Sequence, residues 1–295
     1  MRCICLAVCL RDNRTNNAVI AQNLAVLHTS LTMTDRTSLP PLAAADTIAG
    51  LAKGLSVLES FDTERQRLNA TLAAQRTGLT RAAARRHLLT LAHLGYLESD
   101  GSWFWLAPKV LRFSGAYMAS ARLPRVVLPE LHRLAARTGL SFSCAVRDGD
   151  FVVIVARSAV RESGDRLLAH GVHLGSRLPA HATSTGRVLL AALPEAELRQ
   201  WLASADLQRL TAHTAHAPAA LMALLDAVRE QDHCLAIEEH ELGVQALAVP
   251  LRDMQGHVLA ALNVVTATQR LTPRQMREEL LPLLHEAARA LRPLV

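Results

Sequence analysis

The stretch Leu68–Leu97, LNATLAAQRTGLTRAAARRHLLTLAHLGYL, predicts two short helices joined by a tight turn. Apolar residues recur at helical spacing on either side of Gly78, and this glycine can adopt the positive φ that a sharp inter-helix turn often needs. Thr80 is placed to cap the second helix, because its hydroxyl can accept a hydrogen bond from free N–H groups of the first turn. The stretch therefore indicates a helix-turn-helix.

The second helix carries its cationic side chains away from its apolar side. The residues assigned to the core side are Ala84, Leu88, Leu91 and Gly95. Guanidinium groups on the other side can hydrogen-bond phosphates or the acceptor edge of guanine in a DNA groove. A solvated face on an ordinary helical hairpin is the alternative that the helical pattern alone leaves open. The expected DNA contacts are Arg81, Arg85 and Arg86, with Thr80 and Thr90 as supporting contacts.

Length and charge distribution favour two domains with different tasks. The chain has 295 residues, which is long for one domain, and 50% of them are hydrophobic. The net charge is +6, and residues 50–122 hold ten Lys or Arg side chains against five acidic ones. A basic segment beside a near-neutral remainder suits one nucleic-acid-binding domain and one domain with another function.

The cysteines and the N-terminal segment indicate the compartment. Five cysteines without framework spacing fit a reducing cytoplasm, where a DNA-binding protein would associate with the nucleoid. No apolar run approaches the roughly 20 residues that span a bilayer, so we expect no membrane partner. Residues 1–47 are expected to be a disordered N-terminal extension, and residues 1–32 to precede the true start codon, with Met33 opening an ordinary N-terminal arm.

A further helix and a hairpin complete a winged helix-turn-helix at residues 48–107. Apolar residues at three- and four-residue steps predict an amphipathic helix over 48–61, with Leu51, Leu55, Leu58 and Phe61 on its buried face. Residues 96–106 read as a hairpin with a polar turn, and a hairpin directly after a helix-turn-helix is a wing that can reach DNA. One face of the strand carrying Trp103 and Trp105 is expected to pack on the helices, with stacking on bases as the alternative.

The second half changes character. Pro108 begins a helical stretch that we interpret as a linker helix over 108–122. Pro124 and Pro129 are expected to bracket the next helix, at about 126–137. Hairpin and helix signals then alternate, which predicts an α+β domain with a mainly antiparallel sheet over 123–295. The expected strands are 141–147, 151–157, 166–169, 246–252 and 258–265; the helices are 183–192, 194–203, 218–232 and 272–291; and 173–179 is a loop.

Three blocks of sequence resemble the IclR family of bacterial transcriptional regulators, over roughly residues 49–291. The N-terminal block is GLAKGLSVLESF at 50–61 followed by the helix-turn-helix and wing. The others are LPAHATSTGRVLLAAL at 178–193 and IEEHELGVQALAVPLRDMQGHVLAALNVV at 237–265. The form of TRAAARRHLLTL at 80–91 is similar to the branch that controls protocatechuate, 4-hydroxybenzoate and β-ketoadipate pathway genes.

The resemblance implies a winged helix-turn-helix, a linker helix and a GAF-like α/β effector-binding domain. It also implies homodimers, often paired into homotetramers, on palindromic double-stranded promoter DNA. A small carboxylic-acid effector would lie between the sheet and the helix starting near Ser184, since the N–H groups at a helix N-terminus attract anions. Ile237 and the Gln245–Ala246 pair depart from the polar residues common in related regulators, which puts the effector's identity in doubt. The expected effector residues are His181, Ala182, Thr183, Ser184, Glu238, Glu239, Ala246 and Asn263.

Metal binding and catalysis are weaker interpretations of the polar residues. His170, His173 and His181 have no zinc-site spacing and no accompanying cysteine, so we expect neither a metal nor another cofactor. Cys144 on a strand reads as a small buried hydrophobe, and no activated nucleophile is visible beside the glutamate pair, so we do not expect an enzyme. The sequence predicts a ligand-responsive DNA-binding regulator of a catabolic operon. The alternative is a GAF-like small-molecule sensor or enzyme without sequence-specific DNA binding.

Overall fold

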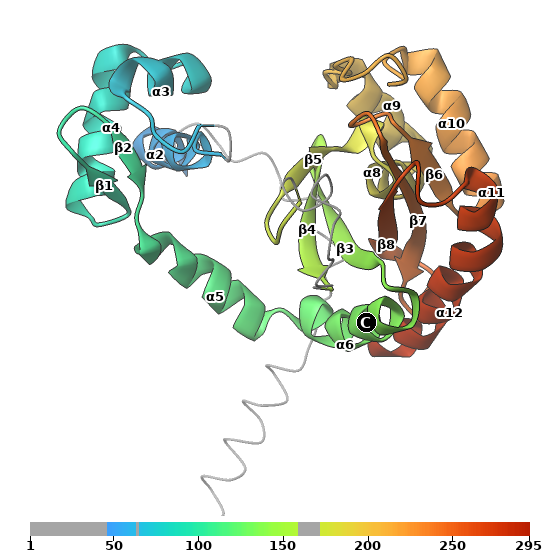
Figure 1. The fold of residues 1–295 in the computed structure, drawn as a ribbon. Coiled ribbons are helices and arrows are strands. Elements are labelled where there is room, and N and C mark those ends of the chain that lie inside the picture. Colours follow the sequence, from blue (N-terminus) through green and yellow to red (C-terminus); the bar gives the residue numbers. More distant parts are fainter. Residues whose placement is uncertain (1–45, 63–64, 159–171) are drawn as a thin grey trace, which may run out of the picture. The chain divides into compact units, whose positions relative to one another are not determined.

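A computed structural model describes residues 46–62, 65–158 and 172–295. The predicted N-terminal extension and the predicted strand at 166–169 therefore lie outside the described residues. Within the described part, no helix has the length and apolar character needed to cross a membrane. The helix-turn-helix part and the sheet-containing part are taken separately below (Figure 1).

The N-terminal part contains three helices and a two-stranded hairpin. The helices are α2 (Ala49–Glu59), α3 (Ala70–Thr77) and α4 (Arg81–His93), and the antiparallel strands are β1 (Leu97–Ser99) and β2 (Phe104–Leu106). One small core holds them together, with Val57, Leu68, Ala84 and Leu88 fully buried. The predicted winged helix-turn-helix is thus confirmed as a fold.

The buried face of α2 differs from the one predicted. Leu51 and Leu55 are 60% and 50% exposed, whereas Val57 is completely buried. Gly54 lies on the inward side, where a Cβ would stand 3.7 Å from Nδ1 of His87 on α4. A glycine at this contact lets the two helices approach closely, which turns the Val57 face inward and two of the predicted leucines outward.

The wing packs through Phe104 and not through its tryptophans. Phe104 is 3% exposed, while Trp103 is 38% exposed. The Nε1 group of Trp105 donates to Glu98 across the hairpin at 2.9 Å. Leu68, just before α3, exchanges two backbone hydrogen bonds with Phe104 at 2.9 and 2.8 Å, so this segment forms a third, one-residue rung beside the wing.

The linker region is a 3-10 turn at Pro108–Val110, α5 (Leu111–Ser120) and then α6 (Arg122–Thr138). Both prolines expected to bracket a helix lie inside α6, which corrects the sequence interpretation. Pro124 sits in the first turn, where its missing N–H costs nothing, whereas Pro129 interrupts the hydrogen-bond ladder. The helix continues through Pro129 because its apolar face is buried before and after it, from Val127 to Leu131.

The C-terminal part is built on one antiparallel sheet of six strands in the order β5-β4-β3-β8-β7-β6. Two strands were not anticipated: β5 lies in the predicted loop, and β6 is a short edge strand. The predicted α+β class with an antiparallel sheet is confirmed. The strands are β3 (Ser141–Asp148), β4 (Phe151–Arg157), β5 (Arg177–Pro179), β6 (Cys234–Ile237), β7 (Val244–Arg252) and β8 (Val258–Ala267).

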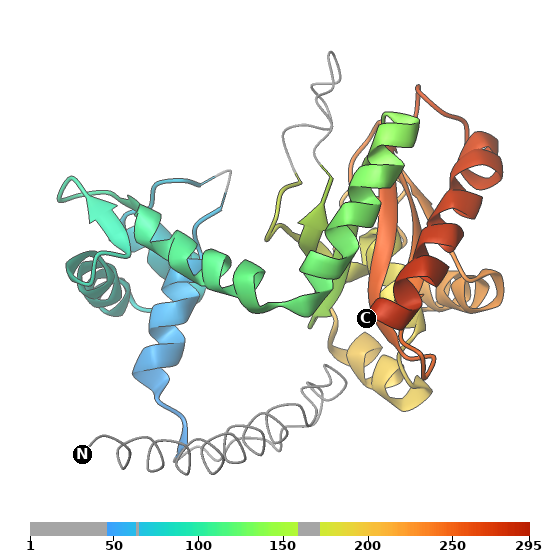
Figure 2. The same cartoon turned by 90° about the horizontal axis from the view of Figure 1, so that it is seen from below.

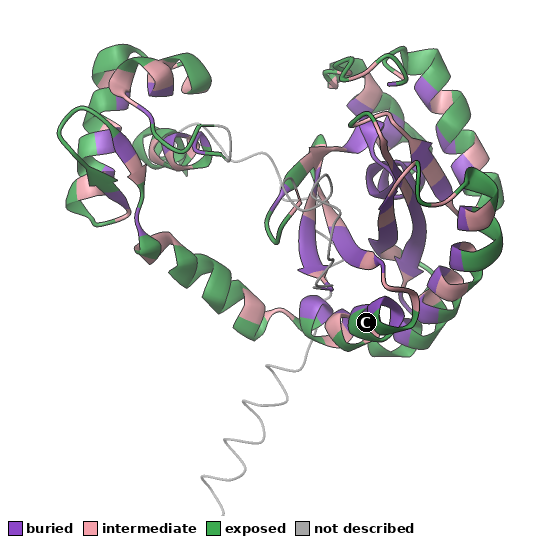
Figure 3. Ribbon diagram, in the orientation of Figure 1, coloured by how far each residue is buried: buried purple, intermediate pink, exposed green. Residues whose placement is uncertain are grey.

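Helices cover both faces of this sheet. On one face α6 and α12 (Leu281–Leu291) pack over buried strand residues such as Phe142 and Val264. On the other face α8 (Ser184–Ala191) packs on the strands, with α9 (Glu195–Ser204) and α10 (Pro218–Gln231) beside it. The sheet is buried along most of its length for this reason (Figures 2 and 3). The last helical segment is not continuous: Pro273–Gln275, a π-helical turn at Met276–Leu280, and α12 follow one another.

Candidate functional site

Helix α4 presents a cationic surface on the helix-turn-helix. The guanidinium-bearing residues Arg81, Arg85 and Arg86 are all exposed, and Ala84 and Leu88 bury the opposite face. The separation follows from helical periodicity, since residues three or four apart share one side. Such a surface can meet DNA phosphates and base edges without unfolding its own core.

The start of α4 is fixed by the two residues that the sequence singled out. Gly78 ends α3 with φ +68°, in the left-handed region. The hydroxyl of Thr80 accepts from the Ala83 N–H at 3.2 Å. Thr90 lies on the exposed side, and its hydroxyl donates to the Arg86 carbonyl at 2.8 Å within the helix.

The end of α4 is held by the linker region. Lys109 donates from Nζ to the carbonyl of Leu94 at 2.7 Å, and the same ammonium lies 4.6 Å from the ring centre of Tyr96. A cation at the C-terminal end of a helix satisfies a free carbonyl and the helix dipole together. The ring of Tyr96 stacks on Phe113 of α5 with 5.6 Å between centroids.

The C-terminal part contains a cavity between the sheet and the N-terminus of α8. Its volume is about 830 Å³ including its open mouth, which lies in the range typical of small-molecule sites. The sheet side comes from two neighbouring rungs of the strand register. One rung is Arg157, Ser143 and Asn263; the next is Ser141, Val265, Ala246 and Ala236.

Six of the eight expected effector residues line this cavity. They are Ala182, Thr183, Ser184, Glu239, Ala246 and Asn263. His181 and Glu238 are not among the lining residues. The ring of His181 is buried and its Nε2 lies 2.9 Å from the carbonyl of Gln208. Glu238 adopts φ +56°, and its carboxylate accepts from the Gly243 N–H at 2.7 Å, closing the turn after β6.

Tight local packing positions the N-terminus of α8. The hydroxyl of Thr183 donates to the Pro179 carbonyl at 3.0 Å and accepts from the Gly186 N–H at 3.2 Å. A Cβ at Gly186 would stand 2.1 Å from the carbonyl oxygen of Ala180, so only glycine fits there. The first turn of α8 is thereby fixed against the preceding 3-10 turn, with its first N–H groups at the cavity.

Two buried polar atoms at the cavity have no hydrogen-bond partner in the described structure. They are Oγ of Ser184 and Oδ1 of Asn263, whose residues are 1% and 6% exposed. Buried polar atoms are nearly always paired in folded proteins, and leaving one unpaired is costly. The two atoms, one on α8 and one on β8, are therefore suited to contact a polar ligand in the cavity.

Sequence reasoning missed several polar lining residues. Arg157 closes β4 and brings a positive charge to the cavity, but the register that sets it beside Ser143 joins strands that sequence alone does not align. His240 follows the glutamate pair, and burial lowers its imidazole pKa from the usual value. The missed polar residues are Ser141, Ser143, Arg157, Thr185, His240 and Glu241.

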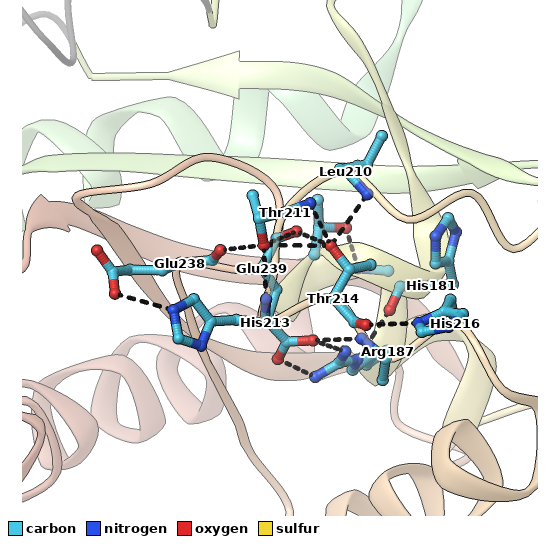
Figure 4. Close-up of polar contacts among 12 residues, drawn as sticks. His181, Arg187, Leu210, Thr211, His213, Thr214, His216, Glu238 and Glu239 are labelled. Atoms are coloured by element: carbon cyan, nitrogen blue, oxygen red, sulfur yellow. Dashed lines mark hydrogen bonds and ion pairs between the residues drawn. The ribbon is translucent and has the colours of Figure 1, made fainter.

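An ion pair lies against the cavity wall. Arg187 of α8 donates to both carboxylate oxygens of Glu239, with 2.5 Å between Nη1 and Oε1 (Figure 4). The same arginine donates from Nε to the carbonyl of His181 at 2.9 Å. Hydroxyls of Thr211 and Thr214 donate to the main chain at Glu238 and Glu239, at 2.7 and 2.6 Å, so a loop after α9 is attached to this cluster.

Other chemistry is poorly supported by the described residues. Within them no group of three or more His, Cys, Asp or Glu side chains is arranged to hold a metal ion. Burial raises the pKa of the Cys144 thiol to about 12, which keeps it protonated and unreactive at neutral pH.

Comparison with known families matches both parts of the chain. Residues 50–101 match the model described as the IclR helix-turn-helix domain, and residues 115–292 match the bacterial transcriptional regulator IclR C-terminal model. A Pca operon regulatory protein of Acinetobacter baylyi is 51% identical over 84% of this chain and 89% of its own length. The p-hydroxybenzoate hydroxylase transcriptional activator of the same species is 50% identical over 85% of this chain and 93% of its own length.

Solved structures give the same picture. A double mutant of the inducer-binding domain of the PobR transcription factor from Acinetobacter, in complex with 3-hydroxybenzoic acid, is 46% identical; the match covers 59% of this chain and all of that domain, with a TM-score of 0.56. An IclR homologue from Microbacterium hydrocarbonoxydans in complex with 4-hydroxybenzoate is 28% identical; the match covers 83% and 98% of the chains, with a TM-score of 0.64. These proteins are transcriptional regulators, which agrees with the expectation that the chain is not an enzyme.

Proposed function

Because this chain belongs to the IclR family of bacterial transcriptional regulators, we propose that it controls aromatic-acid catabolic genes in response to a hydroxylated aromatic carboxylate. The regulators of the Pca operon and of p-hydroxybenzoate hydroxylase, each about half identical to this chain, support this choice of pathway. The effector binds in the cavity beside α8, and the DNA is read by α4.

The pairing of Ser184 and Asn263 across the cavity is the observation that carries the effector assignment. Their unpartnered polar atoms suit the oxygens of a small polar molecule. A carboxylate is favoured because the N-terminus of α8 and the positively charged Arg157 both border the cavity. Apolar side chains such as Val265 and Leu178 provide contact for an aromatic ring.

The DNA-reading surface consists of Arg81, Arg85 and Arg86, with Thr80 and Thr90 at its edges. Their exposure on the side of α4 opposite the core supports the assignment. The helix-turn-helix spans 48–107, the linker helix 108–122 and the effector-binding domain 123–295 in this proposal. The protein acts as a homodimer or homotetramer, because two-fold symmetric regulators match palindromic operators.

Fluorescence anisotropy with labelled DNA from beside the protein's own gene tests the proposal. We expect binding that a scrambled duplex of equal length does not reproduce, and a change in affinity when 3-hydroxybenzoate, 4-hydroxybenzoate or 3,4-dihydroxybenzoate is added. Binding of an acid without any preference for that DNA would favour the alternative, a sensor that does not recognise a DNA sequence. Absence of both kinds of binding would refute the proposal.

A further inference from the structure

Arg187 and Glu239 lie on different sides of the cavity wall. Glu239 lines the cavity, whereas Arg187 is 1% exposed and is not a lining residue. All the hydrogen bonds that Arg187 makes here point to the wall: two to the Glu239 carboxylate and one to the His181 carbonyl. The Glu239 carboxylate also accepts from the Ala215 N–H at 3.3 Å. Arg187 therefore acts on the cavity through Glu239 and not by contact.

The charge of Glu239 is unfavourable for an anionic effector. Two like charges roughly 6 Å apart, in surroundings with an effective dielectric constant of about 20, repel enough to weaken binding roughly a hundredfold. Glu241 also borders the cavity but is exposed, so water screens it. Arg157 is the lining residue with a positive charge. Without a compensating cation behind Glu239, the attraction of Arg157 would be largely cancelled.

We propose that Arg187 is a positioning residue that sets the charge preference of the effector site. By pairing with Glu239 from behind the wall, it neutralises that carboxylate and leaves the cavity selective for an anion over a neutral molecule of the same shape. This inference rests on the proposed function, because it concerns the carboxylate effector assigned there. A role in stability alone would be an inefficient use of the pair, since desolvation offsets most of the attraction between buried charges.

The test is a comparison of an acid with its own primary amide. The acid is whichever of 3-hydroxybenzoate, 4-hydroxybenzoate and 3,4-dihydroxybenzoate the full-length protein binds most tightly by calorimetry. The variants are Arg187→Gln, Glu239→Gln and the double variant with both changes. Arg147→Gln is the matched control, because Arg147 forms a partly buried ion pair with Glu197 at 2.6 Å and does not line the cavity.

The two single variants are expected to shift the acid-to-amide affinity ratio in opposite directions. Arg187→Gln lowers the ratio at least about tenfold, and Glu239→Gln raises it by a similar factor. The double variant returns to within about threefold of the original protein, and Arg147→Gln leaves the ratio unchanged. General damage to the fold would weaken both ligands together, so opposite shifts separate charge from structure.

The remaining outcomes each decide a question. If Arg187→Gln does not fold, Glu239→Gln and the double variant still give the sign and the rescue. Unchanged ratios in a protein that binds the acid would overturn this inference and leave the proposed function standing. If the unmodified protein binds none of the acids or amides, the effector assignment fails and the role of Arg187 fails with it.

Discussion

The arginines of α4 and Arg187 of α8 are the same side chain in opposite environments. On α4 the guanidinium groups are exposed and the core lies behind them, whereas Arg187 is itself behind a cavity wall, with Glu239 bound to it. An exposed cation costs the fold little and remains available to DNA. A buried one must be paired before the protein can fold, so its effect outside reaches only through its partner.

The difference also separates what each region can tolerate. Exposed positions away from caps and cores change stability by no more than about 0.5 kcal/mol when substituted. A buried ion pair that loses one member leaves an uncompensated charge, which is among the largest single-residue effects known. Three substitutions test whether the contrast holds, in order of expected effect.

The largest effect is expected on stability, from Arg187→Gln. Removing the guanidinium leaves the Glu239 carboxylate, whose side chain is 12% exposed, without its ion-pair partner. We expect the free energy of unfolding of the C-terminal domain to fall by about 3–5 kcal/mol, measured by urea denaturation. Arg85→Ala, as the exposed counterpart, is expected to change it by less than about 0.5 kcal/mol. Equal losses for the two variants would remove the distinction.

The next effect concerns DNA affinity, from Arg85→Ala combined with Arg86→Ala. We expect operator binding to weaken roughly a hundredfold, because each arginine contact contributes about 1–3 kcal/mol. The slope of log affinity against log salt should fall by about 1.8, since two phosphate neutralisations are lost. A variant with Arg274→Ala and Arg277→Ala removes the same charge from exposed positions elsewhere and should bind as before. An unchanged slope would argue against α4 as the DNA-reading helix.

The smallest effect is expected from Ser184→Ala. Its hydroxyl oxygen is buried without a partner, so removing it should leave the stability of the effector-free protein unchanged or slightly increased. Effector affinity should fall about fivefold, equivalent to about 1 kcal/mol for one lost hydrogen bond. Thermal denaturation with and without the acid measures both quantities. A loss of stability without effector would mean that the hydroxyl serves the fold and not the ligand.

Features that depend on neighbouring residues could be predicted from the sequence. The turn at Gly78, the cap at Thr80 and the exposed arginines follow from helical periodicity and backbone preferences, which act within a few residues. The same reasoning failed for α2, because the contact between Gly54 and His87 decides its buried face and joins residues far apart in the chain. Periodicity gives the existence of an apolar face but not its partner.

The effector cavity depends on register, which single sequences specify poorly. Ala182, Thr183 and Ser184 could be named from the helix start and the family resemblance. Arg157, Ser143 and Asn263 form one rung only because three strands align, and two of these residues gave no signal in sequence. Arg187 was missed for another reason: it lies in an apolar helix where a single arginine looks like an exposed residue, and its burial depends on Glu239, 52 residues away.

The two backbone hydrogen bonds between Leu68 and Phe104 have a mechanical consequence for DNA reading. Leu68 leads directly into α3 through the Asn69 cap, so the wing cannot tilt independently without breaking bonds that lie in the domain's own core. The hairpin and the helix pair must then arrive at a duplex as one stiff jaw, with the distance between their contacts already set. Operators whose groove width departs from that distance would have to deform themselves, and the energetic penalty would fall on the DNA.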